Sequence, residues 1–233
     1  MTPKSPAQQA RSRTTQTPGL FPEPAPDWLP PGITYLPAYL DLPTQQALRD
    51  EIRAALAHAP FFDPTMPRTG KPWSIRMTNL GTLGWVSDRN GYRYQPEHPR
   101  TGAPWPHLPE MLGNLWDALT GGLARPECCL VNFYRGPRAR MGLHQDRDEQ
   151  ALEAPVLSVS LGDTCLFRIG GFARRDPTRS LRLASGDVLL IGGESRLRFH
   201  GVDRLLPGSS DLLSGGGRLN LTLRRVAPLP LGA

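Results

Sequence analysis

The sequence predicts a mostly β fold with flanking helices (α+β), and two observations carry this prediction. The second half of the chain is a series of short segments with period-two alternation, separated by Gly, Pro or Asp. No helical periodicity lies between these segments, which favours an antiparallel sandwich or jelly roll over an α/β fold. With 233 residues, the chain is long enough for one such domain with a substantial core.

The two ends of the chain are expected to be tails. Residues 1–32 contain eight prolines and few large apolar side chains, so they cannot bury enough surface to offset their ordering entropy. We therefore predict a disordered Pro-rich tail there. Residues 227–233 are predicted to form a short C-terminal tail.

Two helices are predicted before the strands begin. Residues 41–59 form the first, because Asp41 can cap it and Pro43 suits its first turn. Residues 109–119 form the second, and residues 60–106 between them are expected to be irregular or rich in hairpins. The buried faces, at helical spacing, are Leu48, Ile52, Ala55 and Leu56 in the first helix and Leu112, Leu115, Trp116 and Leu119 in the second.

The strand pattern then recurs along the rest of the chain. The predicted strands are residues 129–134, 156–161, 164–169, 179–183, 188–191, 196–200 and 218–224.

Composition excludes some classes of protein and leaves others open. No apolar run is long enough for a membrane span, and the N-terminus has no secretion pattern. The three cysteines fit neither a disulfide framework nor a metal motif, so we expect a cytoplasmic protein. The net charge of +6 is compatible with a polyanionic partner, but a genomic bias toward arginine explains it equally well.

A candidate metal site begins at His144-Gln-Asp146. On a strand, residues two apart point to the same side, and a jelly roll could bring His200 beside the pair. Two histidines and one carboxylate leave three positions open on an octahedral metal, the pattern of non-haem Fe(II) oxygenases. The alternative is a surface His-x-Asp and an unrelated strand histidine.

The strand at residues 218–224 carries the second signal. Its alternation places Arg218, Asn220, Thr222 and Arg224 on one side and leucines on the other. Two guanidinium groups facing a polar cavity would suit a dicarboxylate such as 2-oxoglutarate. The alternative is the solvated outer face of an edge strand.

Together these residues resemble the AlkB family of Fe(II)/2-oxoglutarate dioxygenases, over roughly residues 35–225. The loop at residues 135–142 departs from that resemblance by about one extra residue, and Ile191 stands where an aromatic residue is more common. The shared motifs are Met77-Thr-Asn-x-Gly81, Leu83-Gly-Trp85, Gly91-Tyr92-x-Tyr94, Pro104-Trp-Pro106, Asn132-x-Tyr134, Leu143-His-Gln-Asp-Arg-Asp-Glu149, Pro155-Val-Leu-Ser-Val-Ser-Leu-Gly162, Gly170-Gly171, Gly186-Asp187, Gly192-Gly-Glu-Ser-Arg196, His200-Gly201 and Arg218-x-Asn-Leu-Thr-x-Arg224.

The resemblance implies a fold and a set of cofactors. Residues 127–226 would form a double-stranded β-helix (jelly roll) catalytic core, and residues 33–126 the N-terminal helices and a nucleotide-recognition lid. The cofactors would be Fe(II), 2-oxoglutarate and O2, with His144, Asp146 and His200 as the catalytic metal ligands. The implied 2-oxoglutarate contacts are Asn132, Tyr134, Arg218, Asn220, Thr222 and Arg224, with Arg218 on the distal carboxylate.

The resemblance also implies substrate contacts, each with a plainer alternative. Trp85 would stack on a flipped base opposite His144, with Met77 in the pocket wall, while Tyr92 and Tyr94 would contact the phosphate backbone. Each aromatic could instead be a packing residue of the lid. Asp148 would favour a cationic methylated base, or be a solvated charge. Arg174 would contact substrate, or belong to a solvated loop.

The implied function is oxidative demethylation that repairs 1-methyladenine and 3-methylcytosine and releases formaldehyde. The partner would be methylated single- or double-stranded DNA, and RNA would be a further possible substrate. The protein would be a monomer and would not bind a membrane. Two alternatives stay open. One is the same chemistry on modified RNA, tRNA or protein, and the other is a non-catalytic nucleic-acid-binding module.

Overall fold

The computed structural model describes residues 25–229, in which two antiparallel sheets face each other. The major sheet has the strand order β1-β10-β7-β12-β5-β2, and the minor sheet the order β6-β11-β8-β9. A separate hairpin pairs β3 with β4. The strands are β1 (Ile33–Leu36), β2 (Arg76–Gly81), β3 (Gly84–Asp88), β4 (Gly91–Gln95), β5 (Cys128–Tyr134), β6 (Met141–His144), β7 (Val156–Gly162), β8 (Thr164–Ile169), β9 (Arg179–Leu183), β10 (Val188–Ile191), β11 (His200–Leu206) and β12 (Arg218–Arg224).

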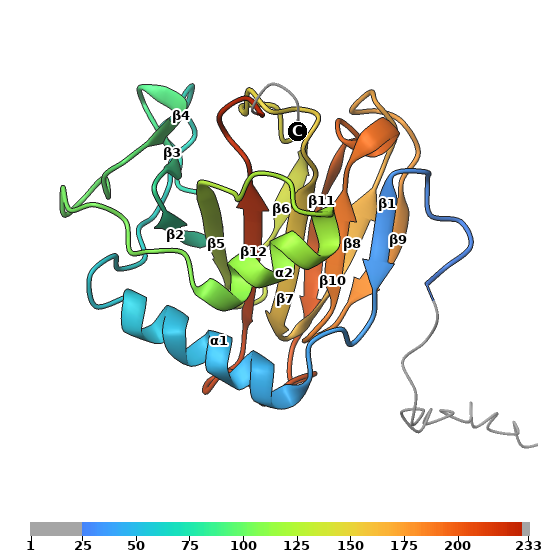
Figure 1. The fold of residues 1–233 in the computed structure, drawn as a ribbon, viewed down its shortest axis with the longest axis horizontal. Helices are drawn as coiled ribbons and strands as arrows, with labels where there is room; N and C mark the ends of the chain where they lie inside the picture. The colour runs from blue at the N-terminus through green and yellow to red at the C-terminus, as the bar shows by residue number, and fades with distance from the viewer. Residues whose placement is uncertain (1–24, 230–233) are drawn as a thin grey trace, which may run out of the picture.

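Two helices, α1 (Leu42–Ala55) and α2 (Glu110–Thr120), cover the outer face of the major sheet (Figure 1). The Asp41 carboxylate accepts a hydrogen bond from the Thr44 amide at 2.9 Å, which is the predicted N-cap. The first helix ends at Ala55, four residues before the predicted end. Beyond Ala55 the chain tightens into a turn, in which the amides of Ala57 and His58 donate to the carbonyls three residues back. Pro60 then prevents any further helix, because the residue before a proline is disfavoured in helical conformation. Neither helix in the described chain is long and apolar enough to cross a bilayer.

Alternation along β12 divides the molecule into two cores. Leu219, Leu221 and Leu223 face the helices, where Leu48 and Trp116 pack against them. The polar residues of the strand face the minor sheet instead. Because β12 lies between β5 and β7, the edge-strand alternative is wrong. The predicted mostly β fold with flanking helices is confirmed.

The strand predictions hold within one residue for six segments and fail for the one at residues 196–200. There the chain makes a 3-10 turn over Gly193–Ser195, and His200 opens β11 when it was expected to close a strand. Arg196 keeps this segment folded, since its buried guanidinium donates to the carbonyls of Ala154 and Asp146. The strands β1, β2 and β6 were not predicted, and neither was the part of β11 that follows His200.

The hairpin of β3 and β4 lies beyond β2, at the edge of the major sheet (Figure 1). Asn79 on β2 anchors it, because its side chain donates to the Trp85 carbonyl at 3.1 Å and accepts from the Trp85 amide at 3.0 Å. Residues 60–106 therefore do contain the expected hairpin, which brings its aromatic residues toward the space between the sheets.

The predicted tails fall mainly on residues 1–24 and 230–233, which lie outside the described residues. Within residues 25–32, however, Trp28 and Leu29 pack against the core between the sheets. The Arg179 guanidinium lies 4.5 Å from the centre of the Trp28 ring. This end of the predicted tail is therefore part of the folded domain.

Candidate functional site

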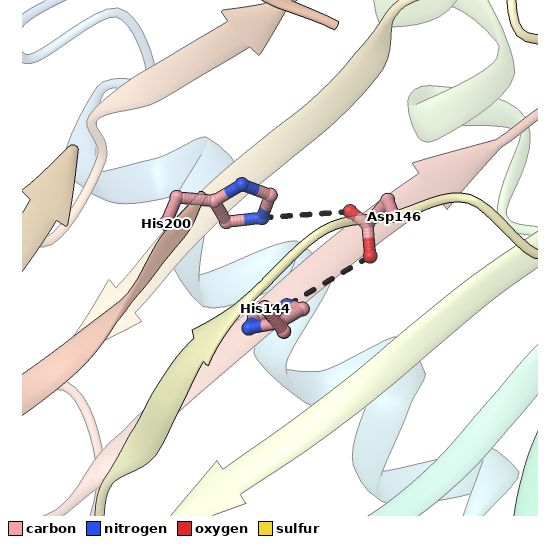
Figure 2. Close-up of side chains that lie close together, drawn as sticks. All are labelled: His144, Asp146 and His200. Carbon is pink, nitrogen blue, oxygen red and sulfur yellow. Dashed lines mark ion pairs between the residues drawn. The ribbon is translucent and has the colours of Figure 1, made fainter. Parts of the chain in front are cut away.

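Three side chains meet between the sheets at one end of the minor sheet (Figure 2). His144 ends β6 and pairs in register with His200, which opens the neighbouring β11. Asp146 follows β6 and turns back toward both rings, with its oxygens 3.8 Å from His144 Nε2 and 3.6 Å from His200 Nε2. The three potential ligand atoms lie within 4.8 Å of one another, close enough to share one metal ion.

Each imidazole is held by a carbonyl on the side away from Asp146. His144 Nδ1 lies 2.9 Å from the Gly142 carbonyl, and His200 Nδ1 lies 3.0 Å from the Arg198 carbonyl. A hydrogen bond there fixes the proton on Nδ1 and leaves the Nε2 lone pair for a metal. Burial, assisted by the nearby charge of His200, lowers the pKa of His144 to about 4, so its ring is neutral at physiological pH.

Asp146 is buried and charged. Burial alone would raise its pKa, but the Arg224 guanidinium, 2.8 Å from Oδ1, and the His200 ring hold that pKa well below its usual value. Its other oxygen, Oδ2, has no hydrogen-bond partner within the described chain. A buried, unpartnered carboxylate oxygen facing two imidazole nitrogens fits a divalent cation, and this ligand set fits Fe(II).

A cavity of about 250 Å³ opens beside this triad. Most of the other predicted site residues line it: Met77, Trp85, Tyr92, Asn132, Tyr134, Asp148, Arg174, Asn220, Thr222 and Arg224. Tyr94 and Arg218 are the two predicted residues that do not.

The register of β5 against β12 builds the polar wall of the cavity. Asn132 lies opposite Asn220, and Tyr134 lies opposite Arg218. Asn220 donates to the Ser158 hydroxyl at 2.7 Å and accepts from Thr222 at 2.9 Å. Polar side chains from neighbouring strands thus lie side by side on the inner face of the major sheet.

Arg218 lies beside Tyr134, behind the residues that line the cavity, and is completely buried. Its guanidinium donates to the Ser160 hydroxyl at 2.7 Å and to the Leu183 carbonyl at 3.2 Å. Its Nε has no partner, and no carboxylate within residues 25–229 forms an ion pair with it. Buried charges are normally paired, so this arginine fits the carboxylate of an anionic ligand such as 2-oxoglutarate.

On the opposite side, the hairpin contributes aromatic rings. Trp85 stacks on Tyr92 with ring centres 5.5 Å apart, and its Nε1 donates to Asp148 at 2.9 Å. Tyr92 is half exposed. Asp148 is exposed, and its carboxylate is tied to the Trp85 ring at the cavity wall.

Tyr94 points inward, because its hydroxyl donates a short hydrogen bond to Glu149. Burial raises the pKa of that hydroxyl, with Arg224 opposing the shift. The expected contact between Tyr94 and a phosphate finds no support in this position. A polar group held inside the protein is poorly placed to meet a backbone outside it.

Met77 lies at the buried end of the cavity and Arg174 at its exposed end. Met77 on β2 is completely buried and forms part of the floor. The Arg174 guanidinium donates to the Leu143 carbonyl and lies over the Phe199 ring, 5.0 Å from its centre. Arg174 is exposed, and these two contacts hold it at the rim, next to His144.

Several cavity residues were missed by sequence reasoning. Glu149 forms a buried ion pair with Arg196 at 3.0 Å, directly behind Asp146. Phe167 stacks on the His200 ring at 5.7 Å, and Trp73 meets Trp85 edge-on. Glu149 and Arg196 both stand inside motifs quoted for the resemblance, so an acid and a base at those positions were a usable signal. Phe167 and Trp73 had no such signal.

Comparisons with known proteins agree with this geometry. The family model of the 2OG-Fe(II) oxygenase superfamily matches residues 32–224. An alpha-ketoglutarate-dependent dioxygenase AlkB homolog of Caulobacter vibrioides is 54% identical over 195 residues, covering 84% of this chain and 88% of that protein. The AlkB dioxygenase of Escherichia coli is 41% identical over 207 residues, covering 87% and 94%.

A solved structure, that of OsALKBH1, matches with a TM-score of 0.72 and 32% identity, covering 85% of this chain and all of that one. The jelly-roll core and the cofactors Fe(II), 2-oxoglutarate and O2 follow from this membership. The alternative of a non-catalytic binding module is therefore wrong. The chain belongs to the 2OG-Fe(II) oxygenase superfamily and, within it, to the AlkB family of Fe(II)/2-oxoglutarate-dependent dioxygenases.

Proposed function

We propose that this dioxygenase repairs DNA by oxidative demethylation of 1-methyladenine and 3-methylcytosine, with RNA as a second substrate to be tested. The observation that carries the proposal is the Trp85–Asp148 pair, which places an aromatic face and a carboxylate at the mouth of the cavity that holds the triad. A flipped base is held by stacking, and a carboxylate favours a positively charged ring. Methylation at N1 of adenine or N3 of cytosine creates that charge.

The two sides of the cavity then have separate tasks. His144, Asp146 and His200 hold iron, and Arg218, Asn132 and Tyr134 bind 2-oxoglutarate with Asn220, Thr222 and Arg224. With its cofactors bound, such a centre oxidises a C–H bond, and an oxidised N-methyl group is released as formaldehyde. The protein orients the methyl group toward the metal, with Met77 below the base and Arg174 at the rim.

Nucleic acid is the substrate class of this family, and the choice between DNA and RNA belongs to the proposal. Other relatives include a tRNA demethylase of Schizosaccharomyces pombe, 29% identical over 68% of this chain, and a DNA N(6)-methyladenine demethylase of Arabidopsis thaliana, 45% identical over 42% of this chain. We further propose that the protein is cytoplasmic, since Cys128, Cys129 and Cys165 are free and buried.

The test is mass spectrometry of oligonucleotides incubated with enzyme, iron and 2-oxoglutarate. Matched single- and double-stranded DNA and RNA would each carry 1-methyladenine, 3-methylcytosine or a neutral N-methyl base. We expect loss of 14 mass units (one CH₂, roughly, when methyl is replaced by hydrogen) from the cationic lesions and little from the neutral one. Equal turnover of the neutral base would remove Asp148 from the proposal, and no turnover of any lesion would overturn the proposed function.

A further inference from the structure

A second hollow lies directly beside the substrate cavity, and arginines dominate its lining. It has a volume of about 840 Å³, and Trp73 forms a wall of both hollows. We call it the basic groove, and define it by Arg76, Arg135, Arg138 and Arg140 together with Ser74 and Phe133. Three of its arginines lie in the loop after β5, the loop that departs in length from the family resemblance.

The positive charge of the basic groove is not neutralised by carboxylates of residues 25–229. All four arginines are exposed, and within residues 25–229 none of them forms an ion pair with a carboxylate. Two acids also line the groove, but Asp203 already pairs with Arg168 at 2.6 Å. Four guanidinium charges therefore face only the unpaired carboxylate of Asp63.

The groove is also held in shape by contacts that leave its charge available. The Arg76 guanidinium lies 5.5 Å from the Phe61 ring centre and 5.3 Å from that of Phe133, so aromatic faces position it. The Ser74 hydroxyl donates to the Arg140 carbonyl at 3.0 Å and accepts from the Arg140 amide at 3.2 Å. These two bonds join the opposite walls through backbone atoms and leave the Arg140 side chain free.

We propose that the basic groove binds the sugar-phosphate backbone of the strand that flanks the flipped nucleotide. This inference rests on the proposed function, because it takes the neighbouring cavity to hold the base. Exposed, unpaired arginines release counterions when they contact phosphates, which is the main source of sequence-independent affinity for a nucleic-acid strand. Trp73 links the two sites, since it packs edge-on against Trp85 with ring centres 5.9 Å apart.

The first experiment measures binding at a series of salt concentrations. The double variant Arg135→Gln/Arg138→Gln is compared with Arg53→Gln/Arg182→Gln, which removes two exposed arginines that line neither hollow. Fluorescence anisotropy would use a labelled single-stranded DNA with one 1-methyladenine, and its unmodified counterpart. We expect the groove variant to lower the slope of log affinity against log salt by about 1.4, roughly 0.7 for each lost phosphate contact.

That loss should be the same for the methylated and unmodified strands, because phosphate contacts carry no information about the base. The control variant should keep the wild-type slope within about 0.3, since its two arginines lie away from the proposed strand path. A groove variant whose slope matches that of the control would overturn the proposal.

The second experiment separates the groove from the proposed function. Formaldehyde release is measured on a methylated trinucleotide, too short to fill the groove, and on a long methylated strand. The groove variant should match wild type on the trinucleotide and lose efficiency several-fold on the long strand. If wild type demethylates both substrates and the groove variant does as well on each, the groove has no role while the proposed function stands. If wild type demethylates neither, the proposed function itself fails, and the groove inference with it.

Discussion

The two walls of the substrate cavity are built in different ways. The core wall consists of the triad and the inner faces of β5 and β12, where strand register sets each side chain beside its partner. The lid wall is the hairpin of β3 and β4, which reaches the core through a few side-chain contacts such as Trp85 to Asp148. The core wall is thus held by the backbone hydrogen bonds of the two large sheets. The lid wall is joined to the rest of the protein by only a few side-chain contacts.

This difference matches the two roles that the walls have in the proposed function: the core wall holds the metal and the cofactor, and the lid wall binds the base. A metal site needs its ligands within a few tenths of an ångström, which a sheet can supply. A base held by stacking tolerates small shifts of the ring, so a hairpin with few anchors is sufficient. Changes in the core wall should therefore abolish turnover or cofactor use, and changes in the lid wall should affect substrate binding alone.

The largest effect is expected for Asp146→Asn, which keeps the side-chain volume and removes the charge. Iron binding and formaldehyde release should both be lost, because a neutral amide is a poor metal ligand next to two imidazoles. Metal content after purification and formaldehyde release are the measurements. Asp148→Asn, two residues further on, is the matched control and should keep its iron. Full activity of Asp146→Asn would show that the triad is not the metal centre.

A large effect on cofactor use is expected for Arg218→Met. The variant removes the buried guanidinium with little loss of volume, so about 1.5–3 kcal/mol of 2-oxoglutarate binding should be lost, a rise in KM of roughly 10- to 150-fold. The KM for 2-oxoglutarate is measured at saturating oligonucleotide. The KM for the oligonucleotide is the internal control and should change little. An unchanged KM for 2-oxoglutarate would remove Arg218 from the cofactor site.

A smaller effect, confined to substrate, is expected for Trp85→Ala. Loss of one stacked base should weaken the binding of methylated DNA by about 1–3 kcal/mol. Consumption of 2-oxoglutarate without substrate should stay at the wild-type rate, since the core wall is untouched. Trp85→Phe keeps a ring but loses the donor to Asp148, and should fall between the two. Equal affinity in wild type and Trp85→Ala would reject the stacking role.

The smallest effect is expected for Tyr94→Phe, which tests how the two walls are joined. The variant leaves Glu149 without the Tyr94 donor, although Arg196 still pairs with that carboxylate. The free energy of unfolding should fall by about 0.5–1.5 kcal/mol, the net contribution of one hydrogen bond, because Glu149 keeps its ion pair with Arg196. Iron content should not change. Chemical denaturation measures the first quantity, and a loss of iron would contradict the separation of the two walls.

The period-two alternation of polar and apolar residues in the sequence was enough to predict most of the core wall. The alternation of β12 follows from one strand lying between two others, so leucines face the helices and polar residues face the cavity. The geometry of the triad depended on topology, which spacing along the chain does not determine. Asp146 lies beyond the end of β6, and it reaches the metal site because the chain turns there, not because a strand continues.

The remaining features depend on tertiary contacts. Arg196 was predicted within a strand because its neighbours alternate, but its guanidinium is satisfied by carbonyls from two distant segments. The inward turn of Tyr94 depends on Glu149, which lies 55 residues away in the sequence. Such long-range partners leave no periodicity, and only the resemblance to a family pointed to the residues involved.

The stack of Trp85 on Tyr92 has a consequence for how lesions are told apart. One face of the indole is already covered by the phenol ring, so Tyr92 has to move aside before a base can stack on that face. Stacking on the indole stabilises a normal base and a damaged base to a similar extent, so it supplies affinity but does not discriminate between them. Discrimination then depends on the one feature that an undamaged base lacks, a formal positive charge close to the Asp148 carboxylate.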